Sequence, residues 1–120
     1  MAALKEYALT KVSTTAGVDM KTAASTTLYT VPNGKSFIPV MVVIRGNSAS
    51  LAGGTSYSFT TFRATVDSSG MTVTTGYRVL LAADNTTYTP IAAGGNFQIT
   101  VTTGSTAACT ATIDVFGYLA

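Results

Sequence analysis

Short apolar segments separated by clusters of turn-forming residues are the feature that most constrains the fold of this chain. Glycine, asparagine, aspartate and serine cluster at intervals of about 8 to 12 residues, a spacing typical of β-sandwiches and barrels. Between clusters, residues 56–63, 97–102 and 107–118 alternate apolar and polar side chains. Such alternation places successive side chains on opposite faces of a strand. We therefore predict an all-β domain, a single jelly-roll-like β-sandwich of about seven or eight antiparallel strands.

The clearest local signal lies in residues 26–47, where two apolar segments flank the sequence Pro32-Asn33-Gly34-Lys35. Proline has its φ already set for a turn, and asparagine and glycine tolerate the left-handed backbone that closes one. The pattern predicts a hairpin that leads into the core strand of the domain, because residues 37–44 form the longest apolar run.

That apolar run carries apolar side chains on both faces of the predicted strand. The face predicted to fill the core carries Ile38, Val40, Val42 and Ile44. The opposite face, predicted to contact another chain, carries Phe37, Pro39, Met41 and Val43. An antiparallel sheet with one wet side would need a polar second face, so a cover from within the domain or from another chain is expected. Pro39 has no N–H to donate and predicts a bulge or an edge position.

Two later segments carry further expectations. Residues 77–82 are predicted to form a strand with Tyr77, Val79 and Leu81 facing the core. Asp67 lies in a turn beside serine and glycine, where an aspartate side chain typically bonds the backbone two residues on.

Residues 1–25 are predicted to form an N-terminal arm joined to a sandwich domain of residues 26–120. The segment lacks clear periodicity and carries five of the chain's twelve charged residues. Such arms are either solvated or packed on a neighbouring subunit. Its apolar candidates for an interface with another subunit are Leu4, Tyr7 and Leu9.

The surface is expected to be poor in charge. Charged residues make up 10% of the chain, whereas about 25% is typical, and 23 threonines and 10 serines supply most of its polarity. One interpretation is a monomer with a threonine-rich surface. The other, which we favour, is a protein covered by copies of itself or by a larger assembly, because interface cores are depleted in charge.

Several classes of function are not expected. The chain has no histidine, which removes the usual base of serine and cysteine hydrolases and the commonest metal ligand. Cys109 is the only cysteine, and the net charge of +2 comes from scattered basic residues, so we predict no thiolate metal cluster and no nucleic-acid partner. No window reaches the roughly 18 apolar residues of a membrane span, and the N-terminal charges do not suit a signal peptide. We predict no enzyme, no cofactor and synthesis in a cytoplasm.

The sequence Thr-Leu-Tyr-Thr-Val-Pro-Asn-Gly-Lys at residues 27–35, followed by an apolar strand ending in Arg45, resembles a segment of small β-rich structural proteins of tailed bacteriophages. These include capsid decoration (cement) proteins and tail or fibre components. The resemblance implies a virion structural protein made in the host cytoplasm, commonly a homotrimer, whose partners are its own copies and a major capsid or other virion protein.

Our leading hypothesis is a non-enzymatic decoration protein that stabilises the phage head by bridging capsid subunits. The alternative is a tail or fibre component that binds host-surface glycan through its tyrosines. A third class, a free carbohydrate-binding or hydrolytic domain, would need paired carboxylates in a cleft.

Overall fold

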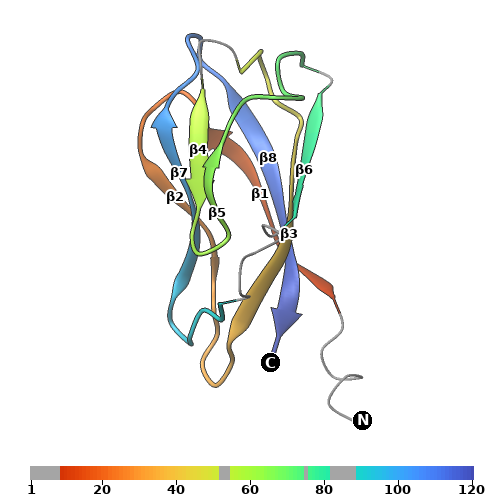
Figure 1. Ribbon diagram of the computed structural model, residues 1–120, viewed down its shortest axis with the longest axis vertical. Helices are drawn as coiled ribbons and strands as arrows, with labels where there is room; N and C mark the ends of the chain where they lie inside the picture. The colour runs from red at the N-terminus through yellow and green to blue at the C-terminus, as the bar shows by residue number, and fades with distance from the viewer. Residues whose placement is uncertain (1–8, 52–54, 75, 82–88) are drawn as a thin grey trace.

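The computed structural model describes residues 9–51, 55–74, 76–81 and 89–120. Within this part the chain is all-β and contains eight strands: β1 (Thr10–Asp19), β2 (Ser25–Thr30), β3 (Phe37–Arg45), β4 (Ser56–Phe59), β5 (Arg63–Val66), β6 (Tyr77–Leu81), β7 (Asn96–Thr103) and β8 (Thr110–Leu119). They form two four-stranded antiparallel sheets, sheet A in the order β1-β8-β3-β6 and sheet B in the order β2-β7-β4-β5 (Figure 1). The predicted β-sandwich is confirmed.

The strands pair from the ends of the chain toward its middle. β1 pairs with β8, β2 with β7, β3 with β6 and β4 with β5, all antiparallel. The pairings β3–β8 and β4–β7 then join these pairs into the two sheets. The chain is thus wound like one long hairpin folded over on itself, so strands far apart in sequence lie side by side (Figure 1).

The core lies between the two sheets and is rich in aromatic rings. Phe97 of β7 stacks on Phe59 of β4 with ring centroids 5.9 Å apart, and it meets Phe62 edge-on at 6.0 Å. Ile99 and Val101 follow Phe97 on the same buried face, as the alternation in this strand predicts. Each such side chain contributes about 1.5 to 3 kcal/mol by leaving water.

The turn at residues 32–35 forms as predicted, but it does not close a hairpin. Lys35 N donates to Pro32 O at 3.2 Å, and Gly34 takes the left-handed φ of 76°. However, β2 belongs to sheet B and β3 to sheet A, so this turn carries the chain from one sheet to the other. The hairpin prediction is wrong because turn residues specify a reversal of the chain without specifying which strands pair.

The predicted alternation in β3 holds only in its second half. Val42 and Ile44 are buried as expected, but Ile38 and Val40 are only partly buried, and Phe37 and Pro39 are buried instead. The register with β8 shifts between Pro39 and Met41, so an extra residue reverses the alternation there. This bulge, anticipated from Pro39, corrects the orientation predicted for the first half of the strand.

The N-terminal segment is largely part of the sandwich. β1 runs along β8 from the pair Thr10↔Gly117 to the pair Asp19↔Thr110, which makes it an edge strand of sheet A. Residues 10–19 of the predicted arm are therefore built into a sheet. Residues 1–8, with Leu4 and Tyr7, lie outside the described residues, and a separate arm there stays a prediction.

Candidate protein interaction surface

The outer side of β6 carries a row of exposed apolar side chains. Tyr77, Val79 and Leu81 are 67%, 47% and 57% exposed, whereas Leu80 is buried. Leu80 pairs with Val42 of β3, which is itself buried, and directly paired residues share a face of a sheet. The prediction that Tyr77, Val79 and Leu81 face the core is therefore wrong. The alternation was identified correctly, but the all-apolar phase was assigned to the core, whereas the register with β3 turns the phase of Arg78 and Leu80 inward.

The row on β6 continues across the sheet. Leu81 pairs with Met41 and Val79 with Val43, and Met41 pairs in turn with Phe116 of β8. Further along β3, Ile38 pairs with Tyr118. We call this outer surface of sheet A face A, and its apolar residues are Ile38, Met41, Val43, Tyr77, Val79, Leu81, Phe116 and Tyr118.

One polar cluster lies in the middle of face A. Asp114 of β8 is only 6% exposed and accepts a hydrogen bond from Arg45 Nε at 2.8 Å and one from Thr14 Oγ1 at 2.7 Å. The Arg45 guanidinium also donates from Nη2 to Asp114 Oδ1 at 3.3 Å. The Arg45 hydrogen bond is the main reason that the pKa of Asp114 lies below its usual value, and burial acts in the opposite direction. The carboxylate is therefore neutralised within the chain and leaves face A essentially apolar.

The outer surface of sheet B, face B, has a different chemistry. Its strands present hydroxyl and amide side chains that bond one another across the strands. The pairs are Ser25 with Thr100 at 2.8 Å, Ser56 with Thr102 at 3.1 Å, and Gln98 with Thr27 at 3.1 Å. Face B is thus the polar, uncharged, wet side expected of an antiparallel sheet.

The residues predicted as interface candidates fall into three groups. Met41 and Val43 lie on face A, half-buried, and Leu9, 48% exposed, precedes the edge strand β1 of the same sheet. Phe37 and Pro39 are inside the domain, where Phe37 packs edge-on against Phe97 at 6.1 Å. Leu4 and Tyr7 lie outside the described residues. The sequence reasoning identified the apolar row on β6 but placed it in the core, since the opposite phase of the strand contains the charged Arg78.

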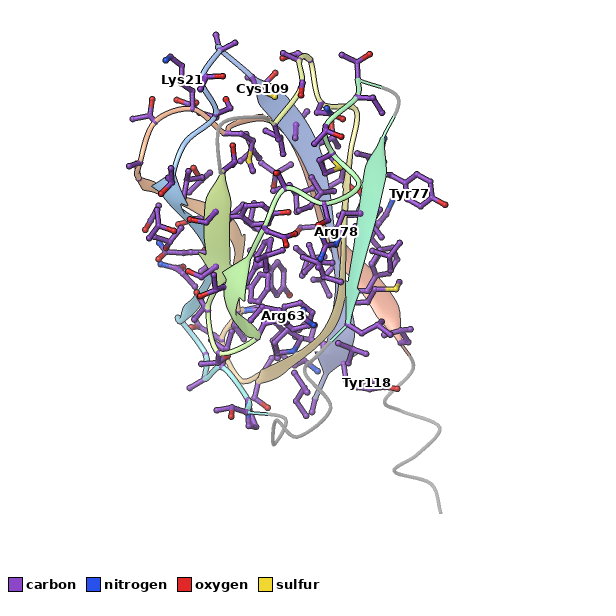
Figure 2. All side chains as sticks on the ribbon, turned by 45° about the horizontal axis from the view of Figure 1, so that its top comes forward. Lys21, Arg63, Tyr77, Arg78, Cys109 and Tyr118 are labelled. Carbon is purple, nitrogen blue, oxygen red and sulfur yellow. The ribbon has the colours of Figure 1, made fainter. Side chains whose placement is uncertain are left out.

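The tyrosines do not gather into a platform in the described part of the chain. Tyr57 is fully buried and Tyr29 packs edge-on against Phe37 at 5.2 Å. Tyr77 and Tyr118 share face A but lie at opposite ends of it, as the labels in Figure 2 show.

The carboxylate of Asp67 and the thiol of Cys109, which lie outside face A, contact nearby residues of the chain. Asp67 accepts a hydrogen bond from Ser69 N at 3.0 Å in the predicted turn, and its hydrogen bonds with Ser69 and with Arg78 lower the pKa of Asp67 to about 2. Cys109 is buried and its thiol lies 3.2 Å from Ala49 O. Among the described residues no three His, Cys, Asp or Glu side chains are grouped to hold a metal ion, and no helix there could span a membrane.

No family model and no curated protein sequence matches the chain. Solved structures that are similar to it include two chains from bacteriophage capsids. One is a chain in the acidic stable capsid structure of Helicobacter pylori bacteriophage KHP30, with a TM-score of 0.51 and 13% identity over 92% of this chain and 91% of that chain. The other is a chain in the capsid asymmetric unit of cyanophage Pam1, with a TM-score of 0.55 and 12% identity over 94% of this chain and 86% of that chain. The protein therefore shares its fold, over nearly its whole length, with chains from two bacteriophage capsid structures.

Proposed function

We propose that this protein is a non-enzymatic structural component of a bacteriophage virion and that it decorates the capsid. The fold likeness to two phage capsid chains supports a place in the virion, and the motif at residues 27–35 independently resembles phage structural proteins. The pairing of strands from the chain ends inward is the winding of a jelly roll, an architecture that viral capsid proteins use.

The observation that carries the proposal is the apolar character of face A. A sandwich that is free in solution would normally have polar side chains on the outer faces of both sheets, and face B has such side chains. Face A instead exposes a continuous apolar surface across β6, β3 and β8, and contiguous exposed apolar patches mark interaction sites. The carboxylate of Asp114 on this face is already paired with Arg45, so burial of the face would not leave that charge without a partner.

The mechanism is burial of face A against a neighbouring virion subunit. Removing apolar surface from water contributes about 25 cal/mol per Å² before the costs of association. A protein that binds only the assembled shell stabilises that shell by mass action, without covalent chemistry. In this proposal the partners are the major capsid protein and other copies of this chain, arranged as a homotrimer that bridges capsid subunits. Leu9, Met41 and Val43 would join the β6 row in the contact.

Capsid particles that lack this protein provide the test. Purified protein should bind them saturably and raise the temperature at which they lose their contents. Val79→Glu, which places a charge in the exposed apolar row of face A, should abolish binding, because desolvating an unpaired carboxylate is costly.

Thr65→Glu is the matched control. Thr65 is exposed on β5, the edge strand of sheet B, just as Val79 lies on the edge strand of sheet A. This variant should bind like the unmodified protein. Equal binding by both variants would contradict the assignment of face A, and no binding by the unmodified protein would contradict the decoration role.

A further inference from the structure

The sandwich has one side where its two sheets are not joined by backbone contacts. β5 is an edge strand of sheet B and β6 an edge strand of sheet A, and no backbone hydrogen bond joins these two strands. On the opposite side, the edge strands β1 and β2 are in contact with each other. The side between β5 and β6 must therefore be closed by other groups.

Two arginine side chains cross this side in opposite directions. Arg63 of β5 donates from Nη1 to the carbonyl oxygen of Leu81, the last residue of β6, at 2.9 Å. Arg78 of β6 donates from Nη1 to Ser69 O at 2.8 Å and to Asp67 Oδ1 at 3.1 Å, just beyond the end of β5. Figure 2 shows Arg78 and Tyr77 leaving β6 in opposite directions, Tyr77 away from the sandwich and Arg78 toward the other sheet.

The hydrogen bonds of Arg78 and Arg63 lie in different surroundings. The Arg78 side chain is 24% exposed and its partner Asp67 is 72% exposed, so the contact joins a partly buried guanidinium to a carboxylate in water, as a charge-assisted hydrogen bond. Asp67 is held in place by Ser69 N, which donates to the same carboxylate oxygen that receives Arg78. Arg63 donates to a backbone carbonyl of β6, which is an edge strand of sheet A, and edge strands present such groups for pairing with other strands.

Tyr57 lies in the core beside this side of the sandwich. It pairs with Val66 of β5 and is fully buried, and burial raises the pKa of its hydroxyl to about 12. Its pairing with Val66 places it beside β5, the edge strand on this side of the sandwich, and the charges of Arg78 and Asp67 also act on its pKa. The chemical reactivity of the Tyr57 side chain can therefore report whether this side of the sandwich is closed.

We propose that Arg63 and Arg78 form a two-part clasp that holds β6 against sheet B, and that the sandwich opens locally on this side when the clasp is released. The same strand carries Tyr77, Val79 and Leu81, so the clasp also sets the position of the exposed row of face A. The inference rests on the contacts within the chain and does not depend on the proposed function.

The test compares the reactivity of two buried side chains in the purified protein. Nitration of Tyr57 by tetranitromethane, located by peptide mass spectrometry, reports opening beside the clasp. In separate samples, reaction of the Cys109 thiol with a disulfide reagent reports global unfolding, because Cys109 is buried at the start of β8. Tyr77, which is exposed in the folded protein, calibrates the nitration.

The variant Arg63→Met with Arg78→Met keeps much of each side-chain stem and removes both guanidinium groups. It should speed nitration of Tyr57 by about tenfold or more, the change expected when hydrogen bonds to charged groups are lost, and leave Cys109 protected. Lys35→Met removes a charge from the exposed turn before β3 and should change neither rate. Should the double variant not fold, each single substitution is measured, together with Arg78→Lys, which should restore part of the protection.

Two results would overturn the clasp. Unchanged nitration of Tyr57 in the arginine variants would show that other groups close this side. A parallel rise in the reactivity of Tyr57 and Cys109 would show that the arginines support global stability and control no local opening.

Discussion

The outer faces of the two sheets have opposite chemistry although they belong to one small sandwich. Face B is covered by hydroxyl and amide groups that pair across strands, such as Ser25 with Thr100. Face A is apolar from β6 to β8, and its only described cluster of ionised groups is Arg45 with Asp114. Water forms hydrogen bonds with the hydroxyl and amide groups of face B but few with the apolar side chains of face A. The difference indicates that face A is the side adapted for burial against another molecule.

The comparison also shows that a low content of charge can serve two purposes. On face B, threonine and serine replace charged residues while still bonding to water and to one another. On face A, the carboxylate of Asp114 has its partners, Arg45 and Thr14, within the chain, so that its burial in an interface would not leave it unpaired. The same low content of charged residues therefore describes two different surfaces, one suited to contact with water and one suited to burial against a partner.

The largest expected effect tests which side of β6 belongs to the core. Leu80→Ala should lower the free energy of unfolding by about 2 to 4 kcal/mol, because it leaves a cavity between the sheets. Val79→Ala, on face A, should lower it by less than about 1 kcal/mol. Urea unfolding of the two variants measures both values. If Val79→Ala were the more damaging change, β6 would face the other way and face A would lose its apolar row.

An intermediate effect concerns the ionised pair on face A and depends on pH. Hydrogen bonds from Arg45 and Thr14 keep the pKa of Asp114 lowered in the folded protein. Such a carboxylate stabilises the fold above its unfolded pKa of about 3.9, and the contribution is lost as the pH falls through the folded pKa. Asp114→Asn should therefore be less stable than the unmodified protein at neutral pH and should lose less stability on acidification. Unfolding midpoints between about pH 7 and about pH 2 measure this difference.

Asp67→Asn is the matched comparison for the pH experiment. The pKa of its carboxylate is lowered to about 2 in the folded state, so its contribution should be lost as the pH falls toward that value, and it lies in a turn away from face A. Identical pH profiles for Asp114→Asn and the unmodified protein would contradict a stabilising role for the pair.

The smallest effect is expected on face B. Ser25→Ala removes one exposed hydroxyl from the pair with Thr100, and water can replace it, so the free energy of unfolding should fall by about 0.5 kcal/mol or less. Its pH profile should match that of the unmodified protein, because neither hydroxyl titrates. A loss as large as that of Leu80→Ala would show that the polar pairs of face B do more than cover a wet surface.

Where only one face of a strand is apolar, the sequence predicted the structure well. Phe97, Ile99 and Val101 of β7 alternate with polar residues and are buried, and the last strand buries Cys109, Ala111, Ile113 and Val115 in the same way. The turn chemistry at Pro32 to Lys35 and at Asp67 was also predicted, because these residues act on their own backbone.

The candidate surface was predicted less well for a physical reason. In β6 the all-apolar phase faces outward, and the phase of Leu80 faces inward although it contains the charged Arg78. In β3 both phases are apolar, and the bulge after Pro39 reverses the alternation partway along the strand. Hydropathy alone cannot predict either orientation. Met41 and Val43 were identified, the β6 row was assigned to the core, and Phe37 was assigned to the surface although it is buried.

By itself, the sequence determined the class of fold and the positions of most strands and turns, because period-two alternation and turn residues act locally. Only the tertiary structure decided which strands pair, which sheet β2 and β3 each join, and which side of β6 faces solvent. Those choices depend on contacts between residues far apart in the chain, such as Val42 with Leu80. Face A is therefore a product of pairing between distant strands, whereas the polar pattern of face B was already visible in the alternation of strands such as β7.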